Sequence, residues 1–513
     1  MARLKEYNGH YCESEYEYAF IGFLEAEGWR YSSGNNIRRV TKRDVLIADD
    51  FKKFIADTNP DLTEDEVTQI YDNVRLVGAE SDFATLHKVY GWMVNGVQFT
   101  PQDELPGMIP LIDFDNWDKN IFRVVNQFTV EYTNNGQKEN RRPDVLLFVN
   151  GMPLCVVELK NPADANATIY DAWEQINIRY WRDIPHLLHY CPLACISDGV
   201  KTRLGTVRTP YEHFYAWRRV NEGDVVSTLP FAETETMIKG VYTPERFVEI
   251  FRDYIYFQDS IYDSDEVEIV CRYPQFFAAK LLKQSIVNSV VTRSGKGGTY
   301  FGATGCGKTY TMAFLARQLA LRCTDIPEIG SPTIILIVDR DELQKQGSKL
   351  FTKSKEFLNL GEVSVVKNRT QLRQELGARQ SGGFYICTIQ KFCDREDDKI
   401  GLINDRQNII CFSDEAHRTQ LEHSKKIQFS KDADENMKAM VSKPYAKVLK
   451  EAFPHATFVG FTGTPIAETY QTFGDEIDRY TMDQAVADGL TVSIKYHPRI
   501  AKVLLKKVKE IEN

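Results

Sequence analysis

Three charged residues in the first half of the chain have the types and spacing of a metal-dependent hydrolytic site. Asp144 stands directly before the apolar run 145–149, and Glu158 and Lys160 end the run 154–160. Strand side chains alternate between faces, so Glu158 and Lys160 share one face. Two carboxylates on neighbouring strands are hard ligands for Mg²⁺, and the lysine can position a water and offset phosphate charge. The pattern alone is weak, because about two such matches per chain are expected by chance.

The surroundings of these residues strengthen the hypothesis of a nuclease site. Asn150-Gly151 is a turn signal between two strongly β-prone runs. We therefore expect a compact hairpin that carries the three charged groups to one end. A solvated charged surface is the alternative, but charges at successive strand ends beside apolar positions suit a site better.

The second half of the chain contains a phosphate-binding loop. The segment 302–309 matches the pattern G-x-x-x-x-G-K-[ST], follows the β-prone piece 299–301 and opens the helical run 310–321. Lys308 would meet the β and γ phosphates, and the hydroxyl of Thr309 would hold Mg²⁺. The loop residues that would wrap the phosphates of ATP are Gly302, Thr304, Gly305 and Gly307. A glycine-rich turn without a nucleotide is the alternative.

The run Asp414-Glu415-Ala416-His417 directly follows the apolar strand 409–412. A strand end points carboxylates into the crevice where a doubly wound sheet binds its ligand. Asp414 would hold the Mg²⁺ shell, and Glu415 would orient and deprotonate the attacking water. A charged helix start would explain an isolated pair, but not one that follows a phosphate-binding loop.

The elements that must position these residues fall into three predicted segments. Residues 1–225 combine a helix over 16–27 with β runs such as 122–130 and 145–149, separated by the turn signal Asn134-Asn135-Gly136. Residues 226–270 form an acidic connector with some helix. In residues 271–513, short β runs alternate with helical patterns, which predicts a doubly wound parallel sheet. These β runs are 333–338, 384–387, 409–412 and 457–459.

Composition limits the classes of protein. The 513 residues carry a formal charge of −9, so any contact with nucleic acid must be local. Neither an apolar run of membrane-spanning length nor an N-terminal signal core is present, so we expect a cytoplasmic protein with no membrane contact. The ten cysteines are too sparse for a disulfide scaffold, which predicts reduced thiols.

The second half resembles superfamily 2 helicases and translocases of the D-E-A-H type. Arg272-Tyr-Pro-Gln275 is similar to their glutamine motif, which implies that Gln275 binds the adenine edge. Segments 338–346 and 388–392 resemble motifs that touch the DNA backbone. Segment 461–465, Phe-Thr-Gly-Thr-Pro, resembles the element that couples hydrolysis to movement. The implied DNA contacts are Arg340, Thr388 and Gln390.

The first half resembles the PD-(D/E)xK nuclease core of the restriction subunit of type I restriction–modification enzymes. The resemblance is carried by segment 141–162, Arg-Arg-Pro-Asp through Glu-Leu-Lys-Asn-Pro, and extends over 197–205 and 473–489. That subunit joins such a nuclease to a D-E-A-H motor in the order found here. The resemblance therefore implies a PD-(D/E)xK-type α/β nuclease domain followed by a RecA-like lobe, with Asp144, Glu158 and Lys160 catalytic.

The resemblance implies two further features of the nuclease site. One is an acidic residue on the first helix, where Glu17 fits best and Glu15 competes. The other is a glutamine and a tyrosine four residues apart on a later helix, whereas Gln175 and Tyr180 are five apart. Because a five-residue spacing rotates two side chains off a common α-helical face, we expect Gln175 at the site and Tyr180 less so.

The function implied is ATP-driven DNA pumping followed by Mg²⁺-dependent cleavage, with methyltransferase and specificity subunits choosing the target. Double-stranded DNA would contact the basic segments 38–43 and 141–142, and Arg340. About fifty residues after Thr464 leave no room for a second motor lobe, so we expect an N-terminal fragment that binds ATP but hydrolyses it slowly. A repair-type nuclease–translocase and a non-catalytic DNA- or ATP-binding regulator are the alternatives.

Overall fold

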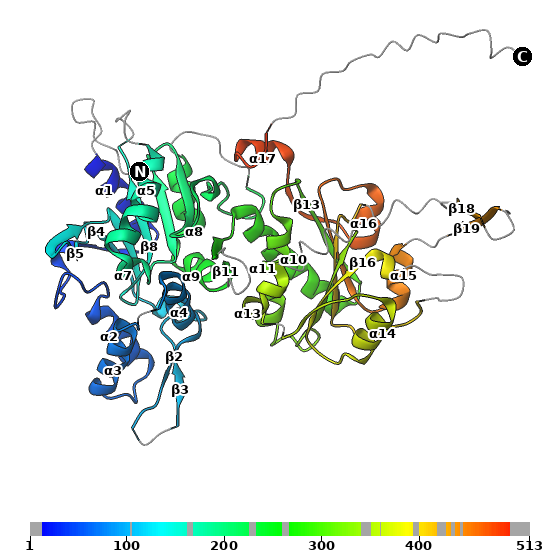
Figure 1. The fold of residues 1–513 in the computed structure, drawn as a ribbon, viewed down its shortest axis with the longest axis horizontal. Helices are drawn as coiled ribbons and strands as arrows, with labels where there is room; N and C mark the ends of the chain where they lie inside the picture. Colours follow the sequence, from blue (N-terminus) through cyan, green and yellow to red (C-terminus); the bar gives the residue numbers. More distant parts are fainter. Residues whose placement is uncertain are drawn as a thin grey trace, which may run out of the picture.

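The computed structural model describes residues 13–78, 80–102, 105–161, 168–224, 232–258, 266–339, 350–359, 361–392, 400–417, 427–431, 437–441 and 445–492. Two large sheets form the two ends of the molecule, with α9 (Pro244–Asp253) and β11 (Ile255–Gln258) between them (Figure 1). The first sheet has six strands and the second has seven. The predicted fold class, an α/β nuclease-type domain followed by a RecA-like lobe, is confirmed.

The first sheet has the strand order β1-β4-β7-β8-β9-β10 and mixes parallel and antiparallel pairs. All residues of β7 and β8 are buried, as expected of apolar strands covered on both faces. The strands are β1 (Arg30–Ser33), β4 (Phe122–Asn126), β7 (Val145–Val149), β8 (Met152–Leu159), β9 (Leu193–Ser197) and β10 (Thr202–Thr206). Four α-helices precede β4 in the described part of the chain: α1 (Glu13–Ala26), α2 (Ala48–Thr58), α3 (Glu64–Arg75) and α4 (Asp82–Asn95).

The predicted hairpin between 145 and 160 is confirmed. Asn150 and Gly151 have φ angles of 50° and 75°, which is the backbone of a tight turn between twisted strands. The turn signal at Asn135-Gly136 is confirmed in the same way, between β5 (Val130–Asn134) and β6 (Gln137–Arg141).

One β run differs from the prediction. The run 122–130 is not a single strand, because β4 ends at Asn126 and β5 begins at Val130. Gln127 between them has a φ angle of 54°, a left-handed conformation that no strand contains. Apolar residues recur on both sides of Gln127 in the sequence, so the hydrophobic pattern did not indicate that the strand ends there.

The predicted connector contains more structure than its composition suggested. It holds α8 (Ala232–Val241), α9, β11 and β12 (Val267–Val270), while its residues 226–231 and 259–265 lie outside the described part. Helix α8 packs on α1 and β10, and α9 packs on α11 (Lys308–Leu321) of the second sheet's domain. The connector therefore joins the two sheets by packed elements.

The second sheet is parallel throughout, in the order β15-β16-β14-β17-β20-β13-β21. Its strands are β13 (Lys296–Gly302), β14 (Thr333–Val338), β15 (Val363–Val365), β16 (Phe384–Thr388), β17 (Ile409–Asp414), β20 (Thr457–Thr462) and β21 (Glu476–Tyr480). Its helices include α10 (Tyr273–Thr292), α11, α13 (Lys355–Leu358), α14 (Arg369–Ala378), α15 (Tyr445–Ala452), α16 (Ala467–Phe473) and α17 (Met482–Ala487). None of the described helices is both long and apolar enough to cross a membrane.

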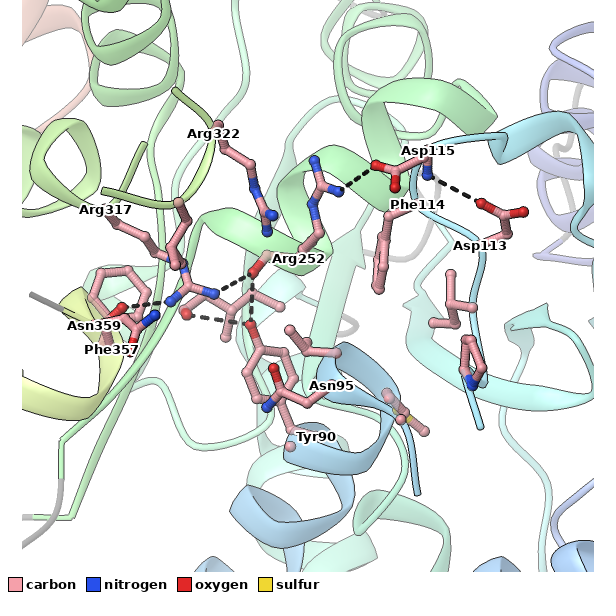
Figure 2. A pocket seen from close by; sticks show the side chains of 18 of the residues that line it. Tyr90, Asn95, Asp113, Phe114, Asp115, Arg252, Arg317, Arg322, Phe357 and Asn359 are labelled. Carbon is pink, nitrogen blue, oxygen red and sulfur yellow. Dashed lines mark hydrogen bonds and ion pairs between the residues drawn. The ribbon is translucent and has the colours of Figure 1, made fainter. Parts of the chain in front are cut away.

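A cavity of about 870 Å³ lies where α4, α9, α11 and α13 meet. Figure 2 shows Arg252, Arg317 and Arg322 reaching into it, with Tyr90 of α4 below them. These three arginines surround Asp253, whose carboxylate accepts hydrogen bonds from Arg322 at 2.7 to 3.1 Å and lies 3.2 Å from Arg252. Tyr90 donates to the carbonyl of Phe251 at 2.9 Å, so the first domain is also anchored to α9.

Candidate active sites

The end of β4, the start of β7 and the end of β8 meet at one edge of the first sheet, because β7 runs antiparallel to both neighbours. Oδ2 of Asp144 accepts a hydrogen bond from the N–H of Leu159 at 2.9 Å. Nζ of Lys160 lies 4.0 Å from Oε2 of Glu158. The fold thus brings together the three residues that the hairpin was expected to gather.

Glu158 is fully buried and is held by a network of hydrogen bonds. The Tyr180 hydroxyl donates to its Oε1 at 2.5 Å, and Nε2 of Gln175 donates to its Oε2 at 2.7 Å. Oε1 of Gln175 accepts from Nζ of Lys160 at 3.1 Å. Burial and the neighbouring Asp144 raise the pKa of Glu158 well above its ordinary value, whereas Lys160 and the Tyr180 hydroxyl lower it. The ionised form of Glu158 therefore depends on nearby positive charge.

The position of Tyr180 corrects the sequence-based expectation. Residues Gln175–Tyr180 form a π-helix rather than an α-helix. A π-helix bonds residue i to residue i+5, so side chains five residues apart become neighbours. Nε2 of Gln175 donates to the Tyr180 hydroxyl at 2.8 Å. The lower expectation for Tyr180 than for Gln175 was wrong, because it assumed α-helical geometry.

Of the two candidate glutamates on the first helix, Glu15 and Glu17, it is Glu17 that reaches this edge of the sheet. Its side chain is 5% exposed, and its carboxylate accepts hydrogen bonds from the amides of Asn126 at 2.6 Å and Gln127 at 2.7 Å. Both amide-bearing residues lie at the end of β4, beside Asp144. Glu15 is half-buried on the same helix.

The donor set at this edge fits Mg²⁺. Asp144 and Glu158 offer carboxylate oxygens, and Mg²⁺ is commonly bound by one or two carboxylates while it keeps several waters. The raised pKa of the buried Glu158 shows that its charge is poorly compensated, and a divalent cation would compensate it. Within the described ranges, no group of three or more His, Cys, Asp or Glu side chains forms a metal cluster. An ion here would therefore draw its other ligands from main-chain or water oxygens.

The predicted phosphate-binding loop connects β13 to α11. Gly305 and Gly307 have φ angles of 84° and 85°, which glycine adopts without a steric penalty. Lys308 begins the 14-residue helix, and its Nζ donates to the carbonyl of Gly302 at 3.2 Å. The helix N-terminus and its free N–H groups favour an anion. Thr304 is exposed at the loop and Thr309 is half-buried on the first helical turn, so this loop fits the phosphates of ATP.

Gln275 lies in the first turn of α10 and is almost fully buried. Its Oε1 accepts from the N–H of Arg272 at 2.9 Å, and its Nε2 donates to the carbonyl of Gly307 at 3.4 Å. The fold therefore places Gln275 directly against the phosphate-binding loop, where the resemblance to helicases implies contact with adenine.

The D-E-A-H residues lie at the end of β17. Glu415 has a φ angle of 48°, and its Oε1 lies 3.9 Å from Nζ of Lys308. Burial raises the pKa of Asp414 to about 6, with Glu415 adding to the shift and Lys308 opposing it. Nδ1 of His417 lies 2.8 Å from the hydroxyl of Thr462 at the end of β20. The structure thus joins the acidic pair to both the phosphate-binding lysine and the Thr-Gly-Thr segment.

The three residues expected to touch the DNA backbone differ in their exposure to solvent. Thr388 is buried at the end of β16 and lies 3.2 Å from Nζ of Lys391. Gln390 is exposed, and its Nε2 donates to the carbonyl of Asp339 at 2.6 Å. Arg340 lies outside the described residues. Contact of any of them with DNA stays a prediction.

Sequence reasoning did not find Asn126 and Gln127, the partners of Glu17. Their position beside Asp144 depends on the pairing of β4 with β7, in which Asn126 lies opposite Val145. Pairing between strands some twenty residues apart has no signature in residue types. A polar pair at the end of an apolar strand was the one available hint.

Two family models match the chain one after the other. Residues 11–213 match the model for the N terminus of the type I restriction enzyme R protein, and residues 274–513 match the model for the SWI2/SNF2 ATPase. The first range holds the Asp144 site and the second holds the phosphate-binding loop.

Curated relatives match almost the whole chain. It is 31% identical over 509 residues to the "Type I restriction enzyme HindI endonuclease subunit" of Haemophilus influenzae, covering 94% of this chain and 46% of that protein. It is 29% identical over 523 residues to the "Putative type I restriction enzyme MjaIXP endonuclease subunit" of Methanocaldococcus jannaschii, covering 95% and 46%. The chain spans about half the length of these relatives.

Among solved structures, the chain matches "The fragment structure of a putative HsdR subunit of a type I restriction enzyme from Vibrio vulnificus YJ016". The identity is 16%, the coverage is 73% of this chain and 57% of that one, and the TM-score of 0.27 carries no argument about the fold. Residues 11–213 therefore match the family of type I restriction enzyme R proteins, residues 274–513 match the SWI2/SNF2 ATPase family, and the curated relatives that match nearly the whole chain are named type I restriction endonuclease subunits.

Proposed function

We propose that this chain carries the nuclease site and the ATP site of a type I restriction endonuclease subunit, in which Mg²⁺-dependent DNA cleavage is coupled to ATP-driven translocation. The observation that carries the proposal is the buried Glu158, tied to Lys160 through Gln175 and placed beside Asp144. A buried carboxylate with a raised pKa that lies beside a lysine and a second carboxylate is typical of a functional site.

At the nuclease site, each side chain has a task that its contacts support. Asp144 and Glu158 hold the ion, which when bound polarises the phosphodiester and activates a water. Lys160 is 14% exposed, so its ammonium can meet a phosphate oxygen while Gln175 fixes its direction. Tyr180 holds the other oxygen of Glu158.

At the ATP site, the loop 302–309 wraps the phosphates, and Lys308 offsets their charge. Thr309 and Asp414 complete the Mg²⁺ shell, Glu415 orients the attacking water, and Gln275 recognises adenine. Nζ of Lys308 and Oε1 of Glu415 lie 3.9 Å apart, so both side chains face the place that the nucleotide would occupy.

Double-stranded DNA reaches the nuclease domain over a basic surface. A groove of about 590 Å³ is lined by Arg43, Arg141 and Arg182. Arg141 pairs with Asp183 at 2.5 Å and Arg39 packs on the Phe128 ring at 3.8 Å, so these two arginines anchor the protein itself. The exposed phosphate-contacting candidates are Arg38, Lys42, Arg43 and Arg142. Binding through them would weaken steeply with salt.

The test is breakage of supercoiled plasmid in Mg²⁺ by the chain assembled with methyltransferase and specificity subunits. Lys160→Ala should abolish breakage and leave binding of a fluorescent ATP analogue unchanged, whereas Lys308→Ala should abolish nucleotide binding. Lys201→Ala, an exposed lysine of the same domain, is the matched control and should behave as the wild type.

The outcomes separate the proposal from its alternatives. Breakage that survives Lys160→Ala would contradict the nuclease assignment. Breakage that needs no methyltransferase would favour a repair-type nuclease–translocase. Loss of breakage in every protein, with nucleotide binding intact, would favour a non-catalytic regulator.

A further inference from the structure

The cavity between α4, α9, α11 and α13 gathers more buried positive charge than negative charge (Figure 2). Arg252 of α9 and Arg317 and Arg322 of α11 line it, and all three act on the carboxylate of Asp253. That carboxylate is 1% exposed, and the three arginine side chains are 10 to 27% exposed. One buried negative charge against three positive charges leaves two positive charges at the cavity wall without a buried counter-charge.

The surroundings of Arg317 reflect this imbalance. The pKa of Arg317 lies below its ordinary value: burial lowers it most, Tyr90 and Asp253 raise it, and the neighbouring Arg322 and Arg252 lower it again. Among the described residues, its buried Nε has no hydrogen-bond partner and lies 3.8 Å from Oδ1 of Asp253. A further negative charge in the cavity would therefore stabilise the cluster.

Two of the arginines keep N–H groups free for a ligand. Nε of Arg252 donates to Asp253 at 3.2 Å and its Nη1 to Asp115 at 3.3 Å, but no described residue bonds its Nη2. Arg322 uses Nε and Nη2 to bond Asp253, and its Nη1 has no partner in the described part of the chain. Both free nitrogens remain accessible to solvent, so a molecule in the cavity can bind them.

The directions of these guanidinium groups are fixed by their packing. Arg252 lies over the Phe114 ring at 5.2 Å, and Arg317 lies over the Phe357 ring at 4.6 Å. Nη2 of Arg317 also donates to the carbonyl of Arg252 at 3.1 Å, which joins α11 to α9. A guanidinium group that is already oriented loses little entropy when it binds an anion.

The acidic residues that line the cavity compete only weakly for these arginines. Asp57 pairs with Lys53 at 2.6 Å, and Asp113 accepts hydrogen bonds from two main-chain N–H groups. The side chain of Asp115 is 91% exposed, and Glu356 is exposed as well. An exposed ion pair contributes little, so the pair of Asp115 with its arginine leaves that arginine available.

We propose that this cavity binds a small phosphate-bearing anion, held by Arg252 from the connector and Arg322 from the ATP-binding domain. A phosphate dianion carries the two negative charges that the cluster lacks, and the planar guanidinium fork matches its oxygens. The cavity of about 870 Å³ admits inorganic phosphate or the phosphate group of a nucleotide. An anion shared by α9 and α11 strengthens the docking of the connector on the ATP-binding domain. Neither arginine belongs to the nuclease site or to the loop 302–309, so the proposal does not depend on the proposed function.

The test measures hydrogen exchange in α9 and in the C-terminal half of α11 while the whole chain is titrated with sodium phosphate. Sodium chloride holds the ionic strength constant, and Lys308→Ala removes phosphate binding by the loop 302–309. We expect saturable protection of both segments. Arg322→Gln should weaken the phosphate affinity about tenfold or more, because it removes a charge-assisted contact. Arg293→Gln, at an exposed arginine of the same domain, is the matched control and should bind as the parent protein does.

A second variant should change the affinity in the opposite direction. Asp115→Asn removes an exposed carboxylate that competes for Arg252, so it should bind phosphate about two- to fivefold more tightly. This prediction can be checked even if Arg322→Gln fails to fold, because Asp115 is a surface residue that leaves the buried cluster intact.

Titration with adenosine monophosphate distinguishes the two sources of the phosphate group. Tighter binding than that of phosphate identifies a nucleotide as the ligand, and equal or weaker binding identifies inorganic phosphate. Three results would overturn the proposal: protection that does not saturate with either probe, equal affinity in folded Arg322→Gln and Arg293→Gln proteins, and unchanged affinity in Asp115→Asn.

Discussion

The ionised form of Glu158 depends on individual neighbours, which makes its titration a sensitive probe of the site. Its carboxylate must be deprotonated to bind a metal ion. Burial and Asp144 raise its pKa, and the Tyr180 hydroxyl is one of the groups that lower it. Removal of that hydroxyl should therefore raise the pKa further, and metal binding should require higher pH.

We expect Tyr180→Phe to move the midpoint of the pH dependence of Mn²⁺ binding upward by about one to two units. A hydrogen bond to a charged group contributes about 1.5–3 kcal/mol, and one pKa unit corresponds to about 1.4 kcal/mol. Mn²⁺ titrations at several pH values measure the midpoint. Tyr190→Phe removes another buried hydroxyl, which bonds the carbonyl of Val74, and should leave the midpoint unchanged. An unchanged midpoint in Tyr180→Phe would contradict the assignment.

Asp414 gives the ATP site its own pH dependence. Its pKa is raised to about 6, so the carboxylate needed for Mg²⁺ becomes protonated as the pH falls through this value. The Mg²⁺-dependent part of the affinity for a fluorescent ATP analogue should fall about tenfold between pH 7 and pH 5.

Two variants check this prediction. Asp414→Asn should remove the pH dependence together with the Mg²⁺ effect. Asp478→Asn removes a second carboxyl whose pKa is raised to about 6, but which pairs with Arg219 instead, and should leave the dependence in place. The assignment fails if the dependence persists in the first variant.

At the level of elements, the π-helix 175–180 determines which side chains reach Glu158. It contains one residue more per turn than an α-helix would, and Ile178 within it is 47% exposed. Deletion of Ile178 would place the glutamine and tyrosine four residues apart, a spacing that an α-helix also brings to one face. We expect this deletion to preserve Mn²⁺ binding within a few-fold.

Insertion of one alanine after Ile178 should have the opposite effect. The pair would be six residues apart, a spacing that neither helix type brings to one face, so Tyr180 would leave Glu158. Mn²⁺ affinity and plasmid breakage should both fall about tenfold or more. Equal behaviour of the deletion and the insertion would show that the π-helix does not set this register.

For the whole molecule, the buried carboxylate of Asp253 joins the connector to the ATP-binding domain. Although burial alone raises its pKa, Arg322, Arg252 and Arg317 hold the pKa below its ordinary value. Asp253 is 1% exposed, whereas Asp115, which pairs with Arg252 across the cavity in Figure 2, has a side chain that is 91% exposed. The two carboxylates therefore differ both in burial and in the number of arginines that act on them.

We expect Asp253→Asn to destabilise the docking of α9 on α11 by about 3 kcal/mol, because it leaves buried arginines without their counter-charge. Asp115→Asn, the exposed control, should cost less than about 1 kcal/mol. Hydrogen exchange of α9 and α11 in urea measures both changes. Equal protection in the two variants would show that the buried carboxylate does not hold the interface.

The arrangement of the molecule was predictable where the signal was local. The apolar run 333–338 became a strand with these bounds, the loop 302–309 joined a strand to a helix, and Asn150-Gly151 formed a tight turn. Each of these depends on residues adjacent in sequence, whose backbone preferences and burial are encoded in their own types.

The sequence by itself therefore determined the two folds, the ATP loop and the hairpin that carries Asp144, Glu158 and Lys160. Tertiary structure decided the rest of the nuclease site, because it depends on contacts between distant residues. Packing against the sheet decides whether Gln175–Tyr180 forms an α-helix or a π-helix. The two helix types differ only in whether the backbone hydrogen bonds join residues four or five apart. Glu17 forms its hydrogen bonds to Asn126 and Gln127 across more than a hundred residues of sequence. Strand propensity alone cannot specify the strand register that brings these residues together.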